Sequence, residues 1–401
     1  MRPSLYRTVK TGRVYYLVVL ISLLWFMVQF LRFVFPPLFE TFQSVYGVSN
    51  AQTGLLFTLI MLSYAAVQFP SGVLGDRFGL PTMILAGAAV FTAAALLAAV
   101  SPSFVVLALA AMLIGFGTGP HKTVAIPLLS RRYADHPGRV LGVMDTVGQF
   151  GGMTAPLVVV VLAGVFVWQS VFVFGAVVSA ALGVLFYRAV RRDPALNVDG
   201  PSGDRPSTDA DDDGSDPTYR SVFADRTLLV FVLVAMCFTF AWNGVASFLP
   251  LYLTVEKGLS TGIAGVLYSL LFAMSVSQAV TGELGDRAGK LTVSVVLFAA
   301  MSVGVGGLLI ANSLVALVAT TVVLGLGFHG FRPVRDAYLM EIIPDGVGGG
   351  TLGAIRTAMT GVGALAPAIV GYLSDVIGFV PAFACIAAAT VIAGVLTLLL
   401  R

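Results

Sequence analysis

Charged residues are scarce in this chain of 401 residues, because only 11% of them are Asp, Glu, Lys or Arg. A soluble globular protein carries about 25% charged residues. The hydrophobic share is 58%, and the mean hydropathy is +0.95. A soluble domain does not bury so much apolar surface, so the composition excludes a soluble enzyme, a nucleic-acid-binding protein and a disordered chain.

Cysteine is scarce as well. The two cysteines, Cys237 and Cys385, lie in separate apolar runs and offer neither a disulfide framework nor a metal-ligand spacing. The chain has no Walker-type phosphate-binding loop, which disfavours an ATP-driven pump. We therefore expect no metal and no cofactor.

Long hydrophobic runs fill the rest of the sequence, and each is close to the length of about 20 residues that a helix needs to span a bilayer. Backbone exposed to lipid has to satisfy its own hydrogen bonds, so these runs are predicted to be helices; the alternating segments of about ten residues found in a membrane barrel are missing. We predict an all-α membrane protein with twelve transmembrane helices. The predicted spans are 14–35, 53–74, 82–100, 104–129, 140–164, 171–190, 227–249, 263–284, 292–311, 314–340, 352–373 and 380–400.

Basic residues are distributed unequally between the predicted connections. They crowd the N-terminal tail and the connections that follow even-numbered helices, whereas the opposite connections carry only Lys257. The positive-inside rule then places both termini in the cytoplasm. We expect a multi-pass protein of the plasma membrane, in contact with the lipid bilayer.

The segment 196–217 differs from everything around it, with seven Asp, one Arg and almost no apolar residues. A cation site at 211–213 is one interpretation. A solvated linker is favoured, because a run of Asp in a polar segment has no fixed geometry for a metal. The linker divides the chain into an N-terminal six-helix half, 1–195, and a C-terminal six-helix half, 218–401.

The two halves repeat each other. The sequence 68–79 aligns with 278–289 at an offset of 210 residues, and pairs of glycines in later helices align at nearly the same offset. Internal repeats of this kind are typical of secondary transporters, with the substrate near the midplane between the repeats.

The aligned segments contain a specific motif. GVLGDRFG (72–79) and GELGDRAG (282–289) are similar to the loop 2–3 motif of the major facilitator superfamily, and the resemblance extends over essentially the whole chain. It implies two pseudo-symmetric six-helix halves that move a small solute by alternating access. The first copy departs from the family pattern, since Leu80 and Pro81 replace the usual basic pair, whereas the second keeps Lys290. The motif residues are Gly72, Asp76, Arg77, Gly79, Gly282, Asp286, Arg287 and Gly289.

Asp76 and Asp286 fall at cytoplasmic helix ends. A carboxylate there can lie against the positive N-terminal end of a helix from the other half, while the following arginine pairs nearby. We expect these residues to form a cytoplasmic gate, although the same charges would also mark a static interface.

Charged side chains inside the predicted helices are the strongest sign of a substrate site, because a charge at the bilayer centre costs at least ~2.5 kcal/mol. The basic residues outnumber the acidic ones, so an anionic substrate would supply the missing negative charge. The basic residues are Arg32, Lys122, Arg332, Arg335 and Arg356, and the acidic ones are Asp145 and Asp336.

Lys122 and Arg332 are repeat equivalents, 210 residues apart and both close to mid-bilayer. Facing each other, they would clamp a carboxylate or phosphate. The alternative for Lys122 is an ion pair with Asp145 on the next helix, which does not exclude substrate binding. Arg356 occupies the repeat position of Asp145.

Two further arginines have possible partners in the sequence. Arg335 and Asp336 are adjacent, and because adjacent helical side chains point apart we expect them to pair only indirectly. Arg32 is a substrate-binding candidate for which pairing with Glu40 is the alternative.

Proton coupling and cavity lining complete the predicted site. Asp145 and Asp336 are candidate proton carriers, because a carboxyl group that is buried in a membrane can titrate in the working range, and His121 and His329 are candidates because histidine titrates near neutral pH. The predicted lining residues are Gln29, Gln149, Trp242 and Asn243. Helix packing is the alternative role for the histidines and for the lining residues.

The sequence therefore indicates a transporter of small organic anions, coupled to H+ and acting as a monomer. A drug or metabolite efflux pump of the same fold is the near alternative, and helix 1 disfavours it modestly because it offers Arg32 where cation exporters commonly use an acid. A membrane-embedded enzyme is the remote alternative, since its chemistry would need clustered Asp or His outside the linker.

The gate hypothesis predicts that Asp76→Asn lowers the transport rate without preventing membrane insertion, because it removes a charge that stabilises one state of the transport cycle. Transport in proteoliposomes and the amount of protein in the membrane measure the two effects separately. A wild-type transport rate in this variant would contradict the hypothesis.

Overall fold

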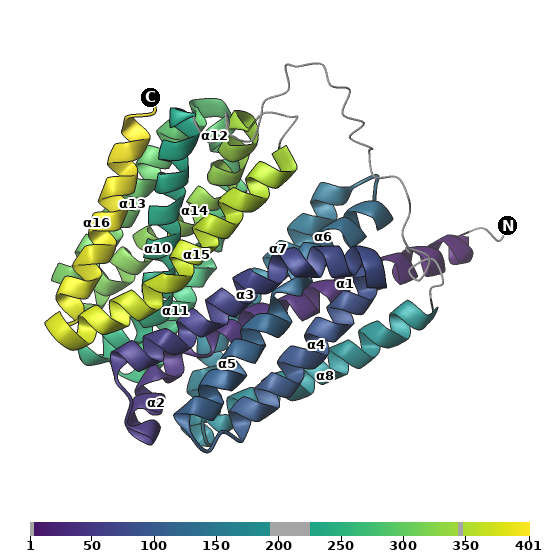
Figure 1. Cartoon of the computed structure of the whole chain (residues 1–401), viewed down its shortest axis with the longest axis horizontal. Coiled ribbons are helices and arrows are strands. Elements are labelled where there is room, and N and C mark those ends of the chain that lie inside the picture. Colours follow the sequence, from purple (N-terminus) through teal and green to yellow (C-terminus); the bar gives the residue numbers. More distant parts are fainter. Residues whose placement is uncertain (1–3, 193–224, 344–347) are drawn as a thin grey trace. The chain divides into compact units, whose positions relative to one another are not determined.

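The computed structural model describes residues 4–192, 225–343 and 348–401 (Figure 1). All elements in these ranges are α-helices or short 3-10 helices. The elements are α1 (Ser4–Phe33), η1 (Pro36–Leu38), α2 (Phe39–Tyr46), α3 (Asn50–Phe78), α4 (Leu80–Ala99), α5 (Phe104–Thr118), α6 (Pro120–Arg132), α7 (Pro137–Val165), α8 (Gln169–Arg192), α10 (Arg226–Val255), α11 (Thr261–Ala273), η3 (Met274–Ser277), α12 (Gln278–Ala288), α13 (Lys290–Ile310), α14 (Leu314–Ile342), α15 (Gly348–Ile377) and α16 (Phe379–Leu398).

Twelve helical segments among the described residues are long and apolar enough to cross a membrane. This confirms the predicted all-α architecture with twelve transmembrane helices. Three of the spans consist of more than one element: α1, η1 and α2 form the first, α5 and α6 the fourth, and α11, η3 and α12 the eighth. The sequence predicted one continuous helix for the fourth span and one for the eighth, and for the first span it predicted only the part 14–35.

The interruption of the fourth span has a local cause. Pro120 has no backbone N–H, so the helical hydrogen-bond ladder loses one bond at this residue. The preceding residue, Gly119, keeps helical angles (φ −61°, ψ −40°), and its N–H donates to the carbonyl of Gly115 at 3.0 Å. The direction of the helix therefore continues through the break, and α6 carries the charged residues that follow.

The chain divides into two compact units, which do not coincide with the predicted halves. Unit 1 contains Met1–Leu38 and Ser63–Arg205, and unit 2 contains Phe39–Leu62 and Pro206–Arg401. The segment Phe39–Leu62 therefore groups with the C-terminal helices, so α3 begins in unit 2 and continues in unit 1. The division into two six-helix halves stays a prediction, and the predicted linker 196–217 lies outside the described residues.

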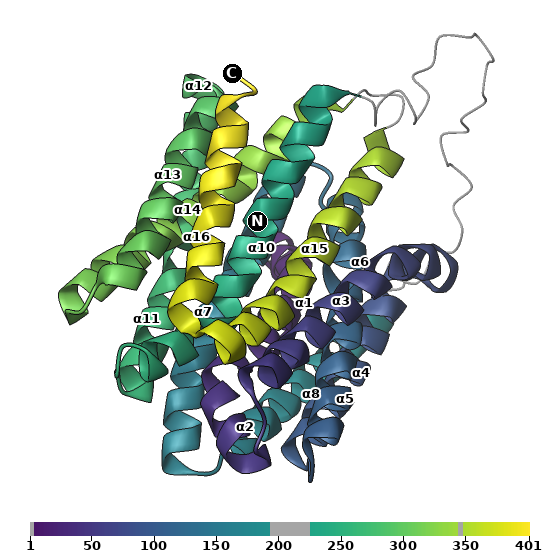
Figure 2. The same cartoon turned by 60° about the vertical axis from the view of Figure 1, so that its left-hand side comes forward.

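In unit 1, α1 packs against α7 and α8, and α4 packs against α5 and α8. The core of this unit is aromatic and aliphatic, with Phe30, Phe91 and Phe172 almost completely buried. In unit 2, α13 packs between α14 and α16, and α10 packs against α15 and α16, as Figure 2 shows from a second side. Tyr252 of α10 is buried, and its ring stacks on Phe383 of α16 at 4.2 Å between centroids.

Glycines allow α1 and α7 to approach each other closely. A Cβ atom at Gly151 would lie 2.2 Å from the backbone carbonyl oxygen of Phe26, and one at Gly148 would lie 2.1 Å from the ring of Trp25. Backbone cannot yield as a side chain does, so the contact at Gly151 fixes the separation of the two helices. Small residues serve this purpose in membrane proteins because helix association there depends on close packing.

We predict that Gly151→Ala destabilises the protein by about 1–3 kcal/mol, the usual cost of overpacking. Thermal unfolding in detergent measures the effect, with size-exclusion chromatography as the readout of the protein that remains folded. Gly164 on the same helix is the matched control, because a Cβ there meets nothing within 4 Å. Equal melting temperatures for Gly151→Ala and Gly164→Ala would contradict the packing argument.

Candidate functional site

Arg32 lies near the end of α1 and is almost completely buried, with 9% of its surface exposed. Its Nη1 donates to Oε1 of Gln29, one turn earlier, at 3.3 Å. The centre of the guanidinium lies 4.1 Å from the centroid of the Tyr64 ring on α3. These contacts lie within unit 1, whereas Glu40, the alternative partner predicted for Arg32, belongs to unit 2. The ring face stabilises the cation without neutralising it.

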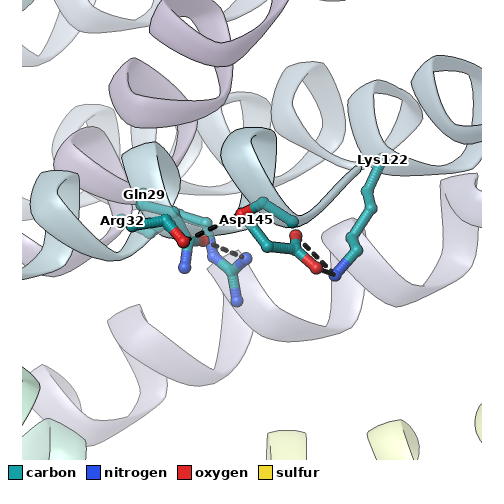
Figure 3. A network of polar contacts seen from close by, with 6 residues as sticks. Gln29, Arg32, Lys122 and Asp145 are labelled. Atoms are coloured by element: carbon teal, nitrogen blue, oxygen red, sulfur yellow. Dashed lines mark hydrogen bonds and ion pairs between the residues drawn. The ribbon is translucent and has the colours of Figure 1, made fainter. Parts of the chain in front are cut away.

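Lys122 on α6 is a further cation of unit 1, and it forms an ion pair with Asp145 on α7, the alternative considered for it from the sequence (Figure 3). The Nζ atom lies 2.9 Å from Oδ1 and 3.1 Å from Oδ2. The two side chains remain 38% and 47% exposed. The ion pair is therefore not enclosed in the core of unit 1.

Trp25 and His121 complete an arrangement that we call the unit 1 cluster (Trp25, His121, Lys122 and Asp145). The imidazole of His121 stacks on the indole of Trp25, with centroids 5.6 Å apart and planes inclined by 8°. Its Nε2 lies 3.1 Å from the carbonyl oxygen of Ile21. The Nζ atom of Lys122 lies 5.7 Å from the same indole centroid. The indole therefore contacts both the histidine and the cation.

Unit 2 contains a similar arrangement, the unit 2 cluster (Trp242, Phe272, His329 and Arg332). The guanidinium of Arg332 on α14 lies 4.5 Å from the centroid of the Trp242 ring on α10. His329 is fully buried and meets the same indole edge-on, with centroids 5.1 Å apart. Phe272 of α11 packs against both Trp242 and His329. Each unit thus places a basic side chain and a histidine on one tryptophan.

Trp25 and Tyr64 are not among the residues predicted from the sequence. The sequence contains a weak signal for Trp25, because tryptophan and histidine are rare in this chain, with three of each. Two of the tryptophans and two of the histidines lie in the two clusters. Trp25 and Trp242 are 217 residues apart, however, and His121 and His329 are 208 apart. A search at the repeat offset of 210 does not align these residues. Tyr64 has no comparable signal.

The expectation for Arg335 and Asp336 is wrong. The Nε and Nη2 atoms of Arg335 both lie 2.8 Å from Oδ1 of Asp336, so the adjacent residues form a direct ion pair. The Cβ atoms of neighbouring helical residues point apart, but the arginine side chain is long enough to bend around the helix and reach the carboxylate of Asp336. Asp336 is therefore already engaged by a cation from its own helix.

The remaining lining candidates fall in different environments. Asn243 donates its side-chain N–H to the carbonyl of Thr239 at 2.9 Å, one turn earlier on α10. Gln149 on α7 has a buried Oε1 without a hydrogen-bond partner among the described residues. Arg356 on α15 is exposed. Of these three, Gln149 is the one with a buried acceptor left unpaired by the described residues.

The two copies of the gate motif have the same backbone but different ion pairs. Gly79 and Gly289 adopt φ angles of 90° and 88° between consecutive helices, a conformation that favours glycine. In the second copy, Lys290 contacts Asp286 at 3.6 Å and Glu341 of α14 at 3.0 Å.

The arginines of the motif also have contacts. Arg287 pairs with Glu283 one turn earlier. In the first copy, Arg77 lies over the ring of Phe78, and both Asp76 and Arg77 are exposed. Leu80 occupies the position in the first copy that Lys290 occupies in the second. The first copy therefore lacks the side chain that forms the ion pair with Glu341 of α14 in the second copy.

The chain matches the sequence model of the Major Facilitator Superfamily over residues 21–303 and 261–401. It belongs to the Major Facilitator Superfamily. The family and the relatives below are transporters, which excludes an enzyme and supports the transport of a small solute by this multi-pass membrane protein.

Two relatives are similar to this chain over most of their length. The hexuronate transporter of Bacillus subtilis (strain 168) is 23% identical over 355 residues, covering 82% of this chain and 81% of the relative. The probable sulfoacetate transporter SauU of Cupriavidus necator is 25% identical over 352 residues, covering 82% of this chain and 80% of the relative. Other relatives are named for drug resistance, among them the fosmidomycin resistance protein of Escherichia coli.

The same fold occurs in a solved structure, a bacterial homologue of the human lysosomal transporter Spinster in an inward-facing and unoccupied conformation. That structure has a TM-score of 0.81 and 16% sequence identity, and the match covers 97% of both chains. This likeness shows the superfamily fold.

Cation–π contact between Trp242 and Arg332 predicts a coupling free energy of about 0.5–2 kcal/mol. A double-mutant cycle with Trp242→Leu and Arg332→Gln measures it through thermal unfolding of the purified transporter. Arg335, whose guanidinium lies over Phe238 at 5.6 Å, supplies the control cycle with Trp242. The contact is contradicted if the Trp242–Arg332 coupling does not exceed the Trp242–Arg335 coupling.

Proposed function

We propose that this transporter moves a small organic anion by alternating access and couples the movement to a proton. The charge of the membrane-spanning segments carries the proposal. Inside the twelve spans predicted from the sequence, leaving out the three residues at either end of each, there are five basic residues and two acidic residues. The resulting excess of positive charge does not depend on which ion pairs form, and a bound anion would reduce it.

The positions of the two clusters support this assignment. Lys122 lies ten residues before Arg132, the end of α6, and Arg332 lies ten residues before Ile342, the end of α14. At 1.5 Å per residue, each cation is about 15 Å from its helix end, which is about half the thickness of the hydrocarbon core. A mid-membrane cation that is partly exposed has to meet water or a ligand, because lipid does not solvate it.

The named substrates of two relatives agree with an anion. Hexuronate is a carboxylate, and sulfoacetate carries both a carboxylate and a sulfonate. A planar guanidinium binds such groups through paired hydrogen bonds, whereas an ammonium acts as a point charge. Arg32 and Arg332 are therefore proposed to orient the anion, and Lys122 to attract it. That Lys122 and Arg332 face each other across the two repeats remains a prediction.

The Lys122–Asp145 pair offers a route to proton coupling. When a substrate anion takes Lys122 as its counter-ion, the carboxylate of Asp145 loses its own cation. Loss of a neighbouring positive charge favours the protonated form of a carboxyl group. Asp145 is thus proposed to take up a proton as the anion binds. Asp336, His121 and His329 are the further candidates for proton transfer.

Charge-neutralising variants separate two roles of Lys122, the binding of the anion and the balancing of the charge of Asp145. We expect Lys122→Gln to lower anion affinity by about 10- to 100-fold, the effect of losing one interaction with a charged group. The double variant Lys122→Gln/Asp145→Asn should bind as weakly, because restoring the charge balance does not restore the binding group. Asp145→Asn alone should bind the anion but lose accumulation driven by a pH gradient.

Counterflow and uptake of labelled glucuronate and sulfoacetate in proteoliposomes measure these quantities. Arg131→Gln, at the exposed end of α6, is the control for loss of a basic residue. Full recovery of affinity in the double variant would show that Lys122 only balances Asp145. Undiminished accumulation in Asp145→Asn would contradict its role as the proton carrier.

Drug efflux is the second candidate function, because some relatives are named as resistance proteins. An exporter of cationic compounds would need an acidic group in the path, yet Asp145 and Asp336 each contact a cation of their own unit. Efflux of a cationic dye, combined with no transport of either labelled anion, would favour this function over anion transport.

A further inference from the structure

The sequence contains a third segment with the pattern of the gate motif. Residues 371–378 read GYLSDVIG, and they share Gly-x-Leu-x-Asp-x-x-Gly with the two copies at 72–79 and 282–289. The third segment differs in one respect, because Val376 follows the aspartate where the other copies have arginine. It lies at the end of α15, the helix that the predicted topology directs toward the extracellular face.

The backbone of this segment matches the other copies. Gly378 separates α15 from α16 with φ 90°, the same left-handed angle as Gly79. In each case, the helix after the glycine begins at the next residue. The third segment is therefore a structural copy of the motif as well as a sequence copy, placed at the opposite membrane face.

The aspartate of this copy caps the first turn of α3. Oδ1 of Asp375 accepts a hydrogen bond from the backbone N–H of Asn50 at 3.0 Å, and Oδ2 accepts one from Ala51 at 2.8 Å. The first N–H groups of a helix have no partner within the helix, and the helix dipole adds a favourable interaction with the negative charge. All these atoms belong to unit 2.

Below the cap, α3 and α15 remain in close contact for about two turns. A Cβ at Gly371 would lie 2.4 Å from the carbonyl oxygen of Asn50, and one at Gly54 would lie 2.2 Å from that of Pro367. The backbone N–H of Ala368 donates to Oγ1 of Thr58 at 3.0 Å. The cap therefore closes a tightly packed helix pair.

We propose that Asp375 is the latch of an outer gate, which holds the first part of α3 (Asn50–Leu62) against α15 and releases it when the transporter opens toward the extracellular face. The carboxylate is exposed, so its two hydrogen bonds can exchange with water. Such a contact suits a reversible gate, because breaking it costs much less than opening a buried ion pair. Alternating access requires the outer ends of the helices to separate once in each cycle.

Electron spin resonance distance measurements on the full chain in lipid nanodiscs test the latch without any substrate. Spin labels at Leu55→Cys and Tyr372→Cys, both exposed positions of unit 2, report the separation of α3 from α15 in a background without Cys237 and Cys385. We expect Asp375→Ala to raise the ratio of separated to packed molecules about tenfold, the effect of losing a helix cap. Asp375→Asn should give a smaller shift, because its side-chain oxygen still accepts one backbone hydrogen bond.

The matched control is Glu40→Gln, which removes another exposed carboxylate of unit 2, from the connection between α1 and α3. It should leave the distances unchanged. Melting temperatures establish that each variant is folded. If Asp375→Ala does not fold, the distances measured in Asp375→Asn decide the test. Distances in Asp375→Asn and Asp375→Ala equal to those of the parent would overturn the proposal. An equal shift in Glu40→Gln would also overturn it, because the effect would then come from charge alone.

Discussion

The cost of a charge in hydrocarbon is the constraint on which the structure depends. An isolated charge at the bilayer centre costs at least ~2.5 kcal/mol, so each one needs a partner or a route to water. Lys122 and Arg335 contact carboxylates, and aromatic rings lie against the guanidinium groups of Arg32 and Arg332. A ring face stabilises a cation and leaves its charge intact. These contacts lower the cost of the charges in the membrane.

The two repeats meet this constraint with different residues. In unit 1, His121 stacks flat on Trp25, and Lys122 is joined to Asp145. In unit 2, His329 meets Trp242 edge-on, and the position equivalent to Asp145 is Arg356. Only one repeat thus carries an acid at this position. Under the proposed function, Asp145 is therefore a candidate for proton coupling that has no counterpart in the other repeat.

The sequence was sufficient for the features that follow a fixed rule. Hydropathy predicts the twelve spans, the repeat offset relates Lys122 to Arg332, and similar depth on neighbouring helices makes an ion pair with Asp145 one of the two interpretations of Lys122. Features without such a rule required the structure. Trp25 and Trp242 occur at a different offset from the cations they contact, and the side chain of Arg335 folds back to Asp336 against the divergence of their Cβ atoms. The assignment of Phe39–Leu62 to unit 2 depends on tertiary contacts that no local pattern encodes.

Helices α3 and α15 both end in a copy of the Asp-containing motif, and the predicted topology places the two copies on opposite membrane faces. Each ends in a copy of the same Asp-containing motif followed by a left-handed glycine, Gly79 or Gly378. In the predicted topology the two helices run in opposite directions, so the two motifs lie on opposite faces. The copy on α15 caps α3 through Asp375. Because α3 begins in one unit and continues in the other, whatever holds or releases its first turns acts on a helix that both units share. If the proposed latch acts as a gate, α3 carries a motif copy at its cytoplasmic end and receives the Asp375 cap at its outer end, so that one helix takes part in the contacts of both faces.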